Sequence, residues 1–212
     1  MEFVYSSFDE DAAYCESIAE YYREKGEVLS GLLLEFTMFY YIWGGLESLI
    51  AIIEPQPVKA ARGLINAACR FLKINYDADR PLLFYEDLII RMKDIMTLVP
   101  DYSDLCCEFR PNEFIGMSGI GLHVIHKIRN RLFHGAISFP EPEAYTDIKS
   151  YDSELIAISS RLCLLTIQML LLAYFNAHDE IGLCWSIYNE REGKKDDIMH
   201  SIRTMHLCSK YS

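Results

Sequence analysis

Helix-breaking residues are scarce in this sequence: its 212 residues include only 11 glycines and 7 prolines. Clean alternation of apolar and polar residues, which would indicate half-buried strands, is absent beyond a few positions, and apolar residues recur mostly at helical spacing. With 51% hydrophobic residues, the composition excludes a disordered or fibrous protein. We therefore predict an all-α protein, a single compact helical bundle over residues 1–212 that can bury a core of its own.

Paired-cysteine motifs and a secretory signal are lacking too. The seven cysteines are an odd number without any C-x-x-C pair, which argues against a disulfide framework. The first residues, MEFVYSSFDEDAAYCE, have neither the basic nor the apolar region of a signal peptide. We expect reduced thiols and a cytoplasmic protein. We expect no metal and no other cofactor, since His200, His206 and Cys208 are spaced unlike the ligands of a helical metal site.

No apolar run reaches the length of a membrane span. The most apolar run, LCLLTIQMLLLAYF at Leu162–Phe175, is shorter than the roughly 20 residues that cross a bilayer. We expect it to be a buried core helix, and we expect no membrane partner.

Basic residues are outnumbered: 20 Lys and Arg stand against 31 Asp and Glu, which gives a formal net charge of −11. Neutralisation of phosphates supplies most non-specific affinity for nucleic acid. The charge therefore argues against broad electrostatic binding to nucleic acid, and any contact with RNA must be local.

The expected helices follow from apolar spacing and from the residues that begin and end them. Gly26 should end an N-terminal helix within about 1–26, and Pro55 should end a long, heavily apolar helix that is central to the core. Pro81 should begin another helix, and residues 101–110 should form a loop. The expected spans are about 9–25, 29–53, 58–73, 81–98, from 111 or 118 to 133, and 152–177, with two shorter helices in a C-terminal extension over about 178–212.

One segment stands apart because it contains no acidic residue. From Phe114 to Pro140 there is no Asp or Glu, and the segment holds half of the chain's histidines. It is the one anion-attracting segment of the chain. Its histidines and basic residues are His123, His126, Lys127, Arg129, Arg131 and His134.

Helical spacing gathers the polar residues of this segment on one face. At about 100° per residue, His126, Arg129, Asn130 and His134 fall within an arc of about 140°. An imidazole, a guanidinium and an amide are thus offered together. The apolar residues of the same helix lie on the other side and should anchor it in the core; they are Leu122, Ile125, Ile128, Leu132 and Phe133.

These residue types suit cleavage of RNA. RNA carries its own nucleophile, the 2′-hydroxyl, so cleavage needs a group that moves its proton, a cation for the charge that builds on phosphorus, and in-line geometry. Histidine transfers protons near neutral pH, and a forked guanidinium suits phosphate. A helix end at Gly135 would favour protonated His134, which fits an acid role at least as well as a base role.

The string RNRLFH, Arg129–His134, resembles the R-x(4–6)-H motif of the HEPN superfamily, in which a polar residue, often Asn, follows the Arg. The surrounding IRNRLFHG is similar to ApeA-like HEPN domains in particular. More loosely, WGGLESL at Trp43–Leu49 resembles the aromatic and acidic early helix of that superfamily. The spacing is the shortest that the motif allows, and Gly135 places His134 at the end of its helix.

The resemblance implies a helical bundle that dimerises so that the two motifs face one another and form one composite ribonuclease site. Arg129 would then clamp the phosphate, Asn130 would orient Arg129 or the substrate, and His134 would act as general acid or base. The resemblance implies no metal.

Four further residues are candidates for substrate binding or for support of the site: His126, Lys127, Arg131 and Glu47. A supporting or merely exposed position explains His126 as well as catalysis does. Lys127 and Arg131 lie toward the polar side, where they touch either substrate or only water. Glu47 is either a buried carboxylate that supports Arg129 or an acid on the helix surface.

The glycine-rich string GMSGIG, Gly116–Gly121, is expected to serve packing. No strand precedes it and no Lys-Ser or Lys-Thr follows, so it lacks the context of a phosphate-binding loop. We expect these glycines to pack against a neighbouring backbone.

The first hypothesis is a metal-independent endoribonuclease, a toxin or antiviral-defence effector that is held inactive until triggered, because free ribonuclease activity would harm its own cell. Its expected partners are RNA, a second copy of the chain in a homodimer, and a protein that inhibits or activates it. The alternative is a non-catalytic HEPN-like module that binds RNA or a protein partner in a defence or toxin–antitoxin system. A third hypothesis is a scaffold dimer.

Overall fold

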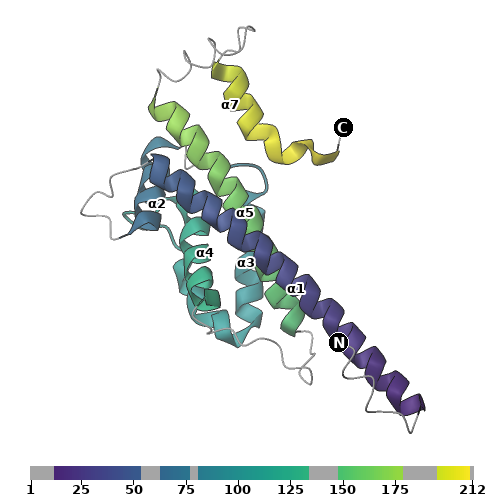
Figure 1. Cartoon of the computed structure of the whole chain (residues 1–212). Helices are drawn as coiled ribbons and strands as arrows, with labels where there is room; N and C mark the ends of the chain where they lie inside the picture. The colour runs from purple at the N-terminus through teal and green to yellow at the C-terminus, as the bar shows by residue number, and fades with distance from the viewer. Residues whose placement is uncertain (1–11, 54–62, 77–80, 134–147, 179–194, 211–212) are drawn as a thin grey trace.

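The computed structural model describes residues 12–53, 63–76, 81–133, 148–178 and 195–210. Within these residues the chain forms helices and no strand, so the predicted all-α class is confirmed (Figure 1). The elements are α1 (Ala12–Ile53), α2 (Leu64–Asn75), α3 (Tyr85–Leu98), the 3-10 helix η2 (Pro100–Glu108), α4 (Met117–Phe133), α5 (Ile148–Ala177), α7 (Lys195–Thr204) and the 3-10 helix η4 (Met205–Lys210).

Helix α5 is the central element of the bundle. It packs against α1, α2, α3, α4 and α7. Its fully buried residues include Leu162, Met169 and Leu172, so the predicted core helix at Leu162–Phe175 is confirmed within a longer helix. Apolar contacts along this helix hold the other helices around it.

Two stretches of helix are long and apolar enough to cross a membrane, judged by length and composition alone. They are Leu33–Ile53, with 28% of its most apolar window buried, and Ser153–Ala177, with 67% buried. The second stretch, of 25 residues, is longer than the apolar run Leu162–Phe175 expected from the sequence. The core helix of a folded bundle passes the same test, and Ser153–Ala177 lies in the central helix α5.

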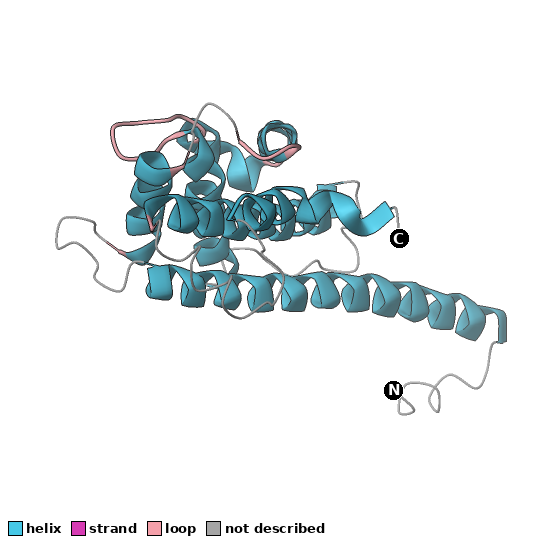
Figure 2. Ribbon diagram, turned by 90° about the horizontal axis from the view of Figure 1, so that it is seen from above, coloured by secondary structure: helices cyan, strands magenta, loops and turns pink. Residues whose placement is uncertain are grey.

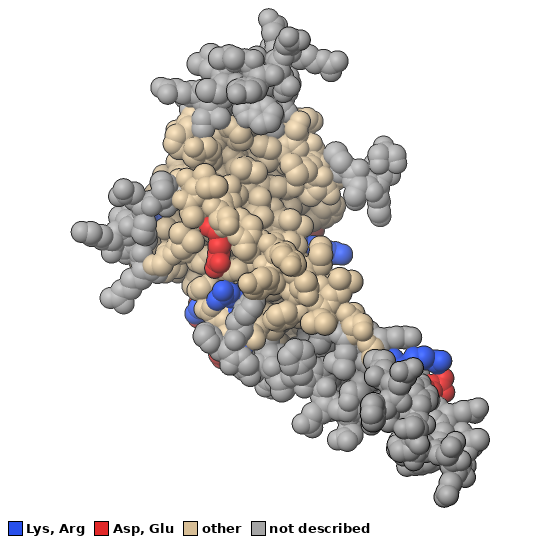
Figure 3. Space-filling view, in the orientation of Figure 1, with Lys and Arg blue, Asp and Glu red and all other residues tan. Residues whose placement is uncertain are grey.

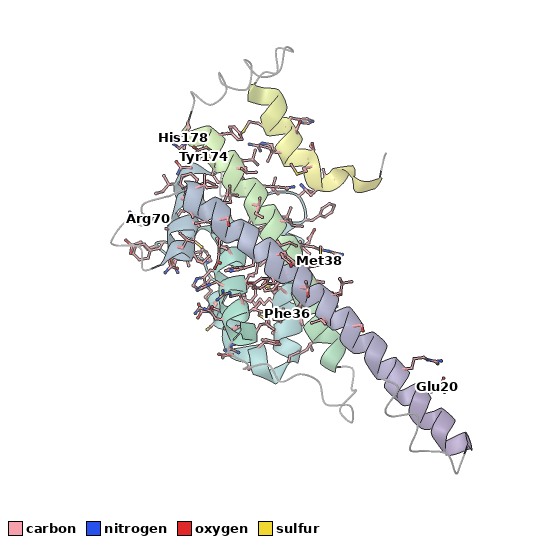
Figure 4. All side chains as sticks on the ribbon, in the orientation of Figure 1. Glu20, Phe36, Met38, Arg70, Tyr174 and His178 are labelled. Atoms are coloured by element: carbon pink, nitrogen blue, oxygen red, sulfur yellow. The ribbon has the colours of Figure 1, made fainter. Side chains whose placement is uncertain are left out.

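Helix α1 is continuous through Gly26, so the predicted break at that residue is wrong. One glycine inside a helix costs only about 1 kcal/mol relative to alanine, whereas proline, the strong helix breaker, does not occur before Pro55. The N-terminal part of α1 extends past the other described helices (Figures 1 and 2). Glu20, labelled in Figure 4, lies on this extension and forms an ion pair with Arg23 at 3.2 Å.

The other described helices cover one face of α1. Phe39, Trp43, Leu46 and Ile50 are buried, whereas the opposite face is apolar and more than half exposed at Leu34, Met38, Tyr41 and Ile52. Figure 3 shows few charged side chains among the residues described on the side of the molecule where α1 runs. The expected central position of this helix is therefore wrong: α5 occupies it, because the bundle covers α1 from one side only.

The connection between α2 and α4 differs from the prediction at two points. Helix α3 begins at Tyr85 and not at Pro81, because Phe84 adopts a left-handed conformation (φ 68°) and ends a turn in which Tyr85 N donates to Leu82 O at 3.0 Å. Most of the expected loop at 101–110 belongs to η2. Tyr102 and Leu105 of η2 are buried three residues apart, which is the repeat of a 3-10 helix.

The remaining helices lie close to their expected spans. Helix α2 begins at Leu64 and α4 ends at Phe133, while α5 starts a few residues earlier than expected. Helices α7 and η4 fall in the expected C-terminal extension. The described cysteines whose side chains are placed, Cys69, Cys106, Cys107 and Cys163, are free thiols.

Candidate functional site

Helix α4 carries the predicted site and is fixed in the bundle by its apolar face. Leu122, Ile125 and Ile128 of this face are fully buried, as the helical spacing predicted. The helix packs against α2, α5 and η2. The polar face is therefore turned away from the core at a defined angle.

The N-terminal turns of α4 pack closely on α3. Tyr85 Oη donates to the Ser118 carbonyl at 2.8 Å and accepts from the Gly121 N–H at 3.0 Å. A Cβ on Gly121 would lie 2.7 Å from Tyr85 Oη, which is too close for any other residue to fit without movement. The expected packing of this string against a neighbouring backbone is found at Gly119, where a Cβ would lie 3.4 Å from Cys69 Cα, whereas the close neighbours of Gly121 are side-chain atoms.

The polar face of α4 holds three predicted residues in a hydrogen-bonded row. Arg129 Nη1 donates to Asn130 Oδ1 at 3.2 Å, and Asn130 Nδ2 lies 3.3 Å from His126 Nε2. With Asn130 donating, His126 Nε2 is the unprotonated nitrogen of a neutral ring. Asn130 therefore links the guanidinium to the imidazole.

Trp43 of α1 covers this row from the side of the other helix. The Trp43 and His126 rings stack with centroids 5.9 Å apart and planes 16° apart. The Arg129 guanidinium carbon lies 5.9 Å from the centroid of the Trp43 ring, within the range of a cation–π contact. Trp43 is 2% exposed, so the contact is largely shielded from water.

Burial lowers the pKa of His126 below its ordinary value of 6.5, and the positive charge of Arg129 lowers it further. The Glu47 carboxylate acts in the opposite direction and raises this pKa. Burial and Arg129 prevail, so His126 is neutral at pH 7. A neutral ring agrees with its position as acceptor from Asn130.

The other basic side chains of α4 point to acids of η2. Lys127 forms an ion pair with Glu108, and His123 Nε2 lies 3.0 Å from the same carboxylate. Arg131 forms an ion pair with Asp104. Lys127, followed by His123, lowers the pKa of Glu108, and Arg131 lowers that of Asp104.

The acid-free segment is thus partly neutralised by carboxylates that precede it in the chain. Glu108 and Asp104 were missed in the sequence analysis because they lie outside the segment and in a region expected to be a loop. Of the cationic side chains described on α4, Arg129 is the one that lies on the Trp43 side. This places the positive charge of the candidate site at Arg129.

An open pocket of about 390 Å³ adjoins Arg129. Its lining comes from α1 between Tyr40 and Ser48 and from Arg129 of α4. Glu47 lines this pocket. From the sequence it was expected to be either a buried carboxylate that supports Arg129 or an acid on the helix surface, and in the structure it is half-buried. We refer to it below as the α1 pocket.

The structure brings together five residues of the candidate site. Four of them were predicted as site residues, whereas Trp43 was named only as the first residue of the string WGGLESL. His126, Arg129 and Asn130 meet on α4, and Glu47 and Trp43 reach them from α1. The aromatic cluster FTMFYYIW in the sequence is the signal that could have identified Trp43 and its neighbours. His134 and Gly135 lie outside the described residues.

No group of three or more His, Cys, Asp or Glu side chains converges as a metal site within the described ranges. Comparison of the chain with protein-family models, with curated proteins and with solved structures gave no match.

Proposed function

We propose that this chain is an endoribonuclease of the HEPN type that cleaves RNA without a metal ion. The observation that supports the proposal is the row of Arg129, Asn130 and His126 beside an open pocket. A guanidinium oriented by an amide is suited to a phosphate diester, because its planar fork of N–H groups matches the geometry of two phosphate oxygens.

In the proposed reaction the 2′-oxygen of the substrate attacks phosphorus and the bond to the 5′-oxygen breaks, which leaves a 2′,3′-cyclic phosphate. One group removes the proton of the 2′-hydroxyl and another supplies a proton to the leaving oxygen. We assign proton transfer to His134 and stabilisation of the charge on phosphorus to Arg129. Asn130 positions the guanidinium, and neutral His126 holds Asn130.

The proposal includes a homodimer with a composite site, because one protomer supplies only one Arg129 and one His134. The exposed apolar residues of α1 outside the α1 pocket, among them Leu34, Met38 and Ile52, offer a surface for the second copy. An active ribonuclease in the cytoplasm would harm its own cell, so the proposal extends to a toxin or antiviral-defence effector with a protein partner that controls it.

The test is incubation of the purified protein with labelled single-stranded RNA in EDTA. Wild type should cleave RNA to 2′,3′-cyclic phosphate ends or their hydrolysis products and should leave DNA intact, since DNA has no 2′-hydroxyl. His134→Ala should lose about 10² to 10⁴ in rate, and Arg129→Ala a comparable or larger factor. Arg129→Lys should recover little, because a point charge cannot make the forked contact.

Lys127→Ala is the matched control, since it removes a cation of the same helix that is held by Glu108. It should retain most of the activity. Cleavage by folded Arg129→Ala and His134→Ala at the wild-type rate would refute the assignment.

A non-catalytic module that binds RNA or a protein is the second candidate. The observation that favours it is that His126 is neutral and stacked on Trp43 while Lys127 and Arg131 are bound by acids. The described residues of α4 therefore offer Arg129 as the cation for phosphate and no base that is both charged and mobile. Binding of RNA by wild type without cleavage under any condition would select this function.

A further inference from the structure

The α1 pocket contains two glycines that no contact among the described residues requires. Gly44 and Gly45 lie inside α1, where glycine destabilises a helix relative to alanine. Among the described residues, a Cβ at either position would meet no atom within 4 Å. Packing within this part of the chain therefore does not explain them, whereas an open approach to the helix backbone does.

Aromatic rings and a guanidinium surround this open stretch. Tyr41 is 71% exposed and Tyr40 is 54% exposed, and their rings meet edge to face with centroids 6.0 Å apart. Arg129 lines the same pocket from α4. Exposed aromatic faces next to a guanidinium are the groups with which proteins bind single-stranded nucleic acid, because bases stack on the rings and Arg takes the phosphate.

Glu47 gives the pocket an acceptor for the edge of a base. It lines the pocket, and its carboxylate accepts hydrogen bonds only, so it repels phosphate and favours a group that donates hydrogen bonds. Every base carries an amino or ring N–H that can donate to it, so the preference among bases comes from stacking, for which purines offer a larger face than pyrimidines do. The volume of about 390 Å³ falls in the range of pockets that hold small ligands.

We propose that the α1 pocket binds one purine nucleotide of a single-stranded RNA, with its base against Tyr41, its amino edge toward Glu47 and its phosphate at Arg129. This inference rests on the proposed function in taking RNA as the ligand, and it adds the subsite that selects the base next to the bond to be cleaved. Gly44 and Gly45 leave room for the nucleotide against the helix.

The experiment measures binding of fluorescent oligonucleotides whose 2′-oxygens are methylated, so that cleavage cannot occur. Wild type should bind the oligo(A) form more tightly than the oligo(U) form. Tyr41→Ala and Gly44→Leu should each weaken oligo(A) binding about 5- to 100-fold, the usual effect of losing one stacked base.

Two controls separate loss of the subsite from loss of structure. Tyr41→Phe keeps the ring and should bind as wild type does. Gly31→Leu makes the same change as Gly44→Leu at another exposed glycine of α1 with no atom within 4 Å, but outside the pocket lining, and should leave binding unchanged. Thermal unfolding should show both leucine variants to be at least as stable as wild type.

The outcomes distinguish this inference from the nuclease proposal. Base-dependent binding that needs Tyr41, without cleavage of ordinary RNA, would support the subsite and count against the nuclease. Cleavage of RNA with unchanged binding by Tyr41→Ala and Gly44→Leu would overturn the subsite alone. Absence of RNA binding by wild type would also overturn the subsite. Variants that change the mass measured by light scattering but not the affinity for RNA would overturn it too, and they would assign the pocket to contact between copies.

Discussion

Replacement of Gly121 by alanine should destabilise the protein although it favours helix. The new Cβ would lie 2.7 Å from Tyr85 Oη, 3.1 Å from Ile89 Cδ1 and 3.2 Å from Tyr85 Cζ. Tyr85 is 1% exposed, and its hydroxyl is hydrogen-bonded to Ser118 and Gly121, so the ring has no room to withdraw. The methyl group must displace either the ring or helix α4.

The magnitude follows from three terms. Overpacking of a core costs about 1–3 kcal/mol, and loss of the two hydrogen bonds of Tyr85 costs about 1 kcal/mol each. The higher helix propensity of alanine returns about 1 kcal/mol. We expect Gly121→Ala to lower the free energy of unfolding by about 2–4 kcal/mol, measured by urea denaturation.

A double-mutant cycle tests the cause. Tyr85→Phe removes the oxygen that the new methyl group would meet, so Gly121→Ala should cost at least about 1 kcal/mol less in that background. Gly31→Ala, where no atom lies within 4 Å, should raise stability by up to about 1 kcal/mol. Equal stability of Gly121→Ala and wild type, or absence of coupling to Tyr85, would refute the close packing of α4 on α3.

Three further predictions concern charge. The pKa of folded His126 is lowered from 6.5, so the unfolded chain binds more protons at this residue and the stability of the protein should fall as pH drops below about 6.5. Urea denaturation at about pH 7.5 and 5.5 should show a smaller fall for His126→Gln than for wild type. An equal fall would count against burial of a neutral ring. The pKa of folded Glu108 is lowered from 4.5, so its contribution to stability is present above that pH and is lost progressively as pH falls through the lowered folded pKa. Glu108→Gln should therefore lower Tm more at pH 7 than at about pH 3, and an equal effect at the two pH values would contradict the ion pair with Lys127. If RNA binds at Arg129 alone in each protomer, the logarithm of the binding constant should fall with the logarithm of salt concentration with a slope of only about −0.7 per protomer, and anisotropy titrations with a much steeper slope would show that Lys127 or Arg131 also reaches phosphate.

Helical periodicity made much of the fold predictable, because it depends on residues a few positions apart. The buried face of α4 at Leu122, Ile125 and Ile128 follows directly from it. The break expected at Gly26 shows where local rules are weak, since the helix propensity of one glycine is a small term. The helix η2 was not predicted, because a short helix gives only a short pattern: two buried residues three positions apart, Tyr102 and Leu105.

The sequence alone determined that an imidazole, a guanidinium and an amide share one face of α4, since their spacing fixes their directions on the helix. Tertiary structure decided what surrounds them. Trp43 reaches His126 and Arg129 from a helix far away in the chain, and Glu108 and Asp104 pair with Lys127 and Arg131 across the bend between η2 and α4. Such partners depend on how whole helices pack, and the spacing of residues along one helix carries no information about that packing.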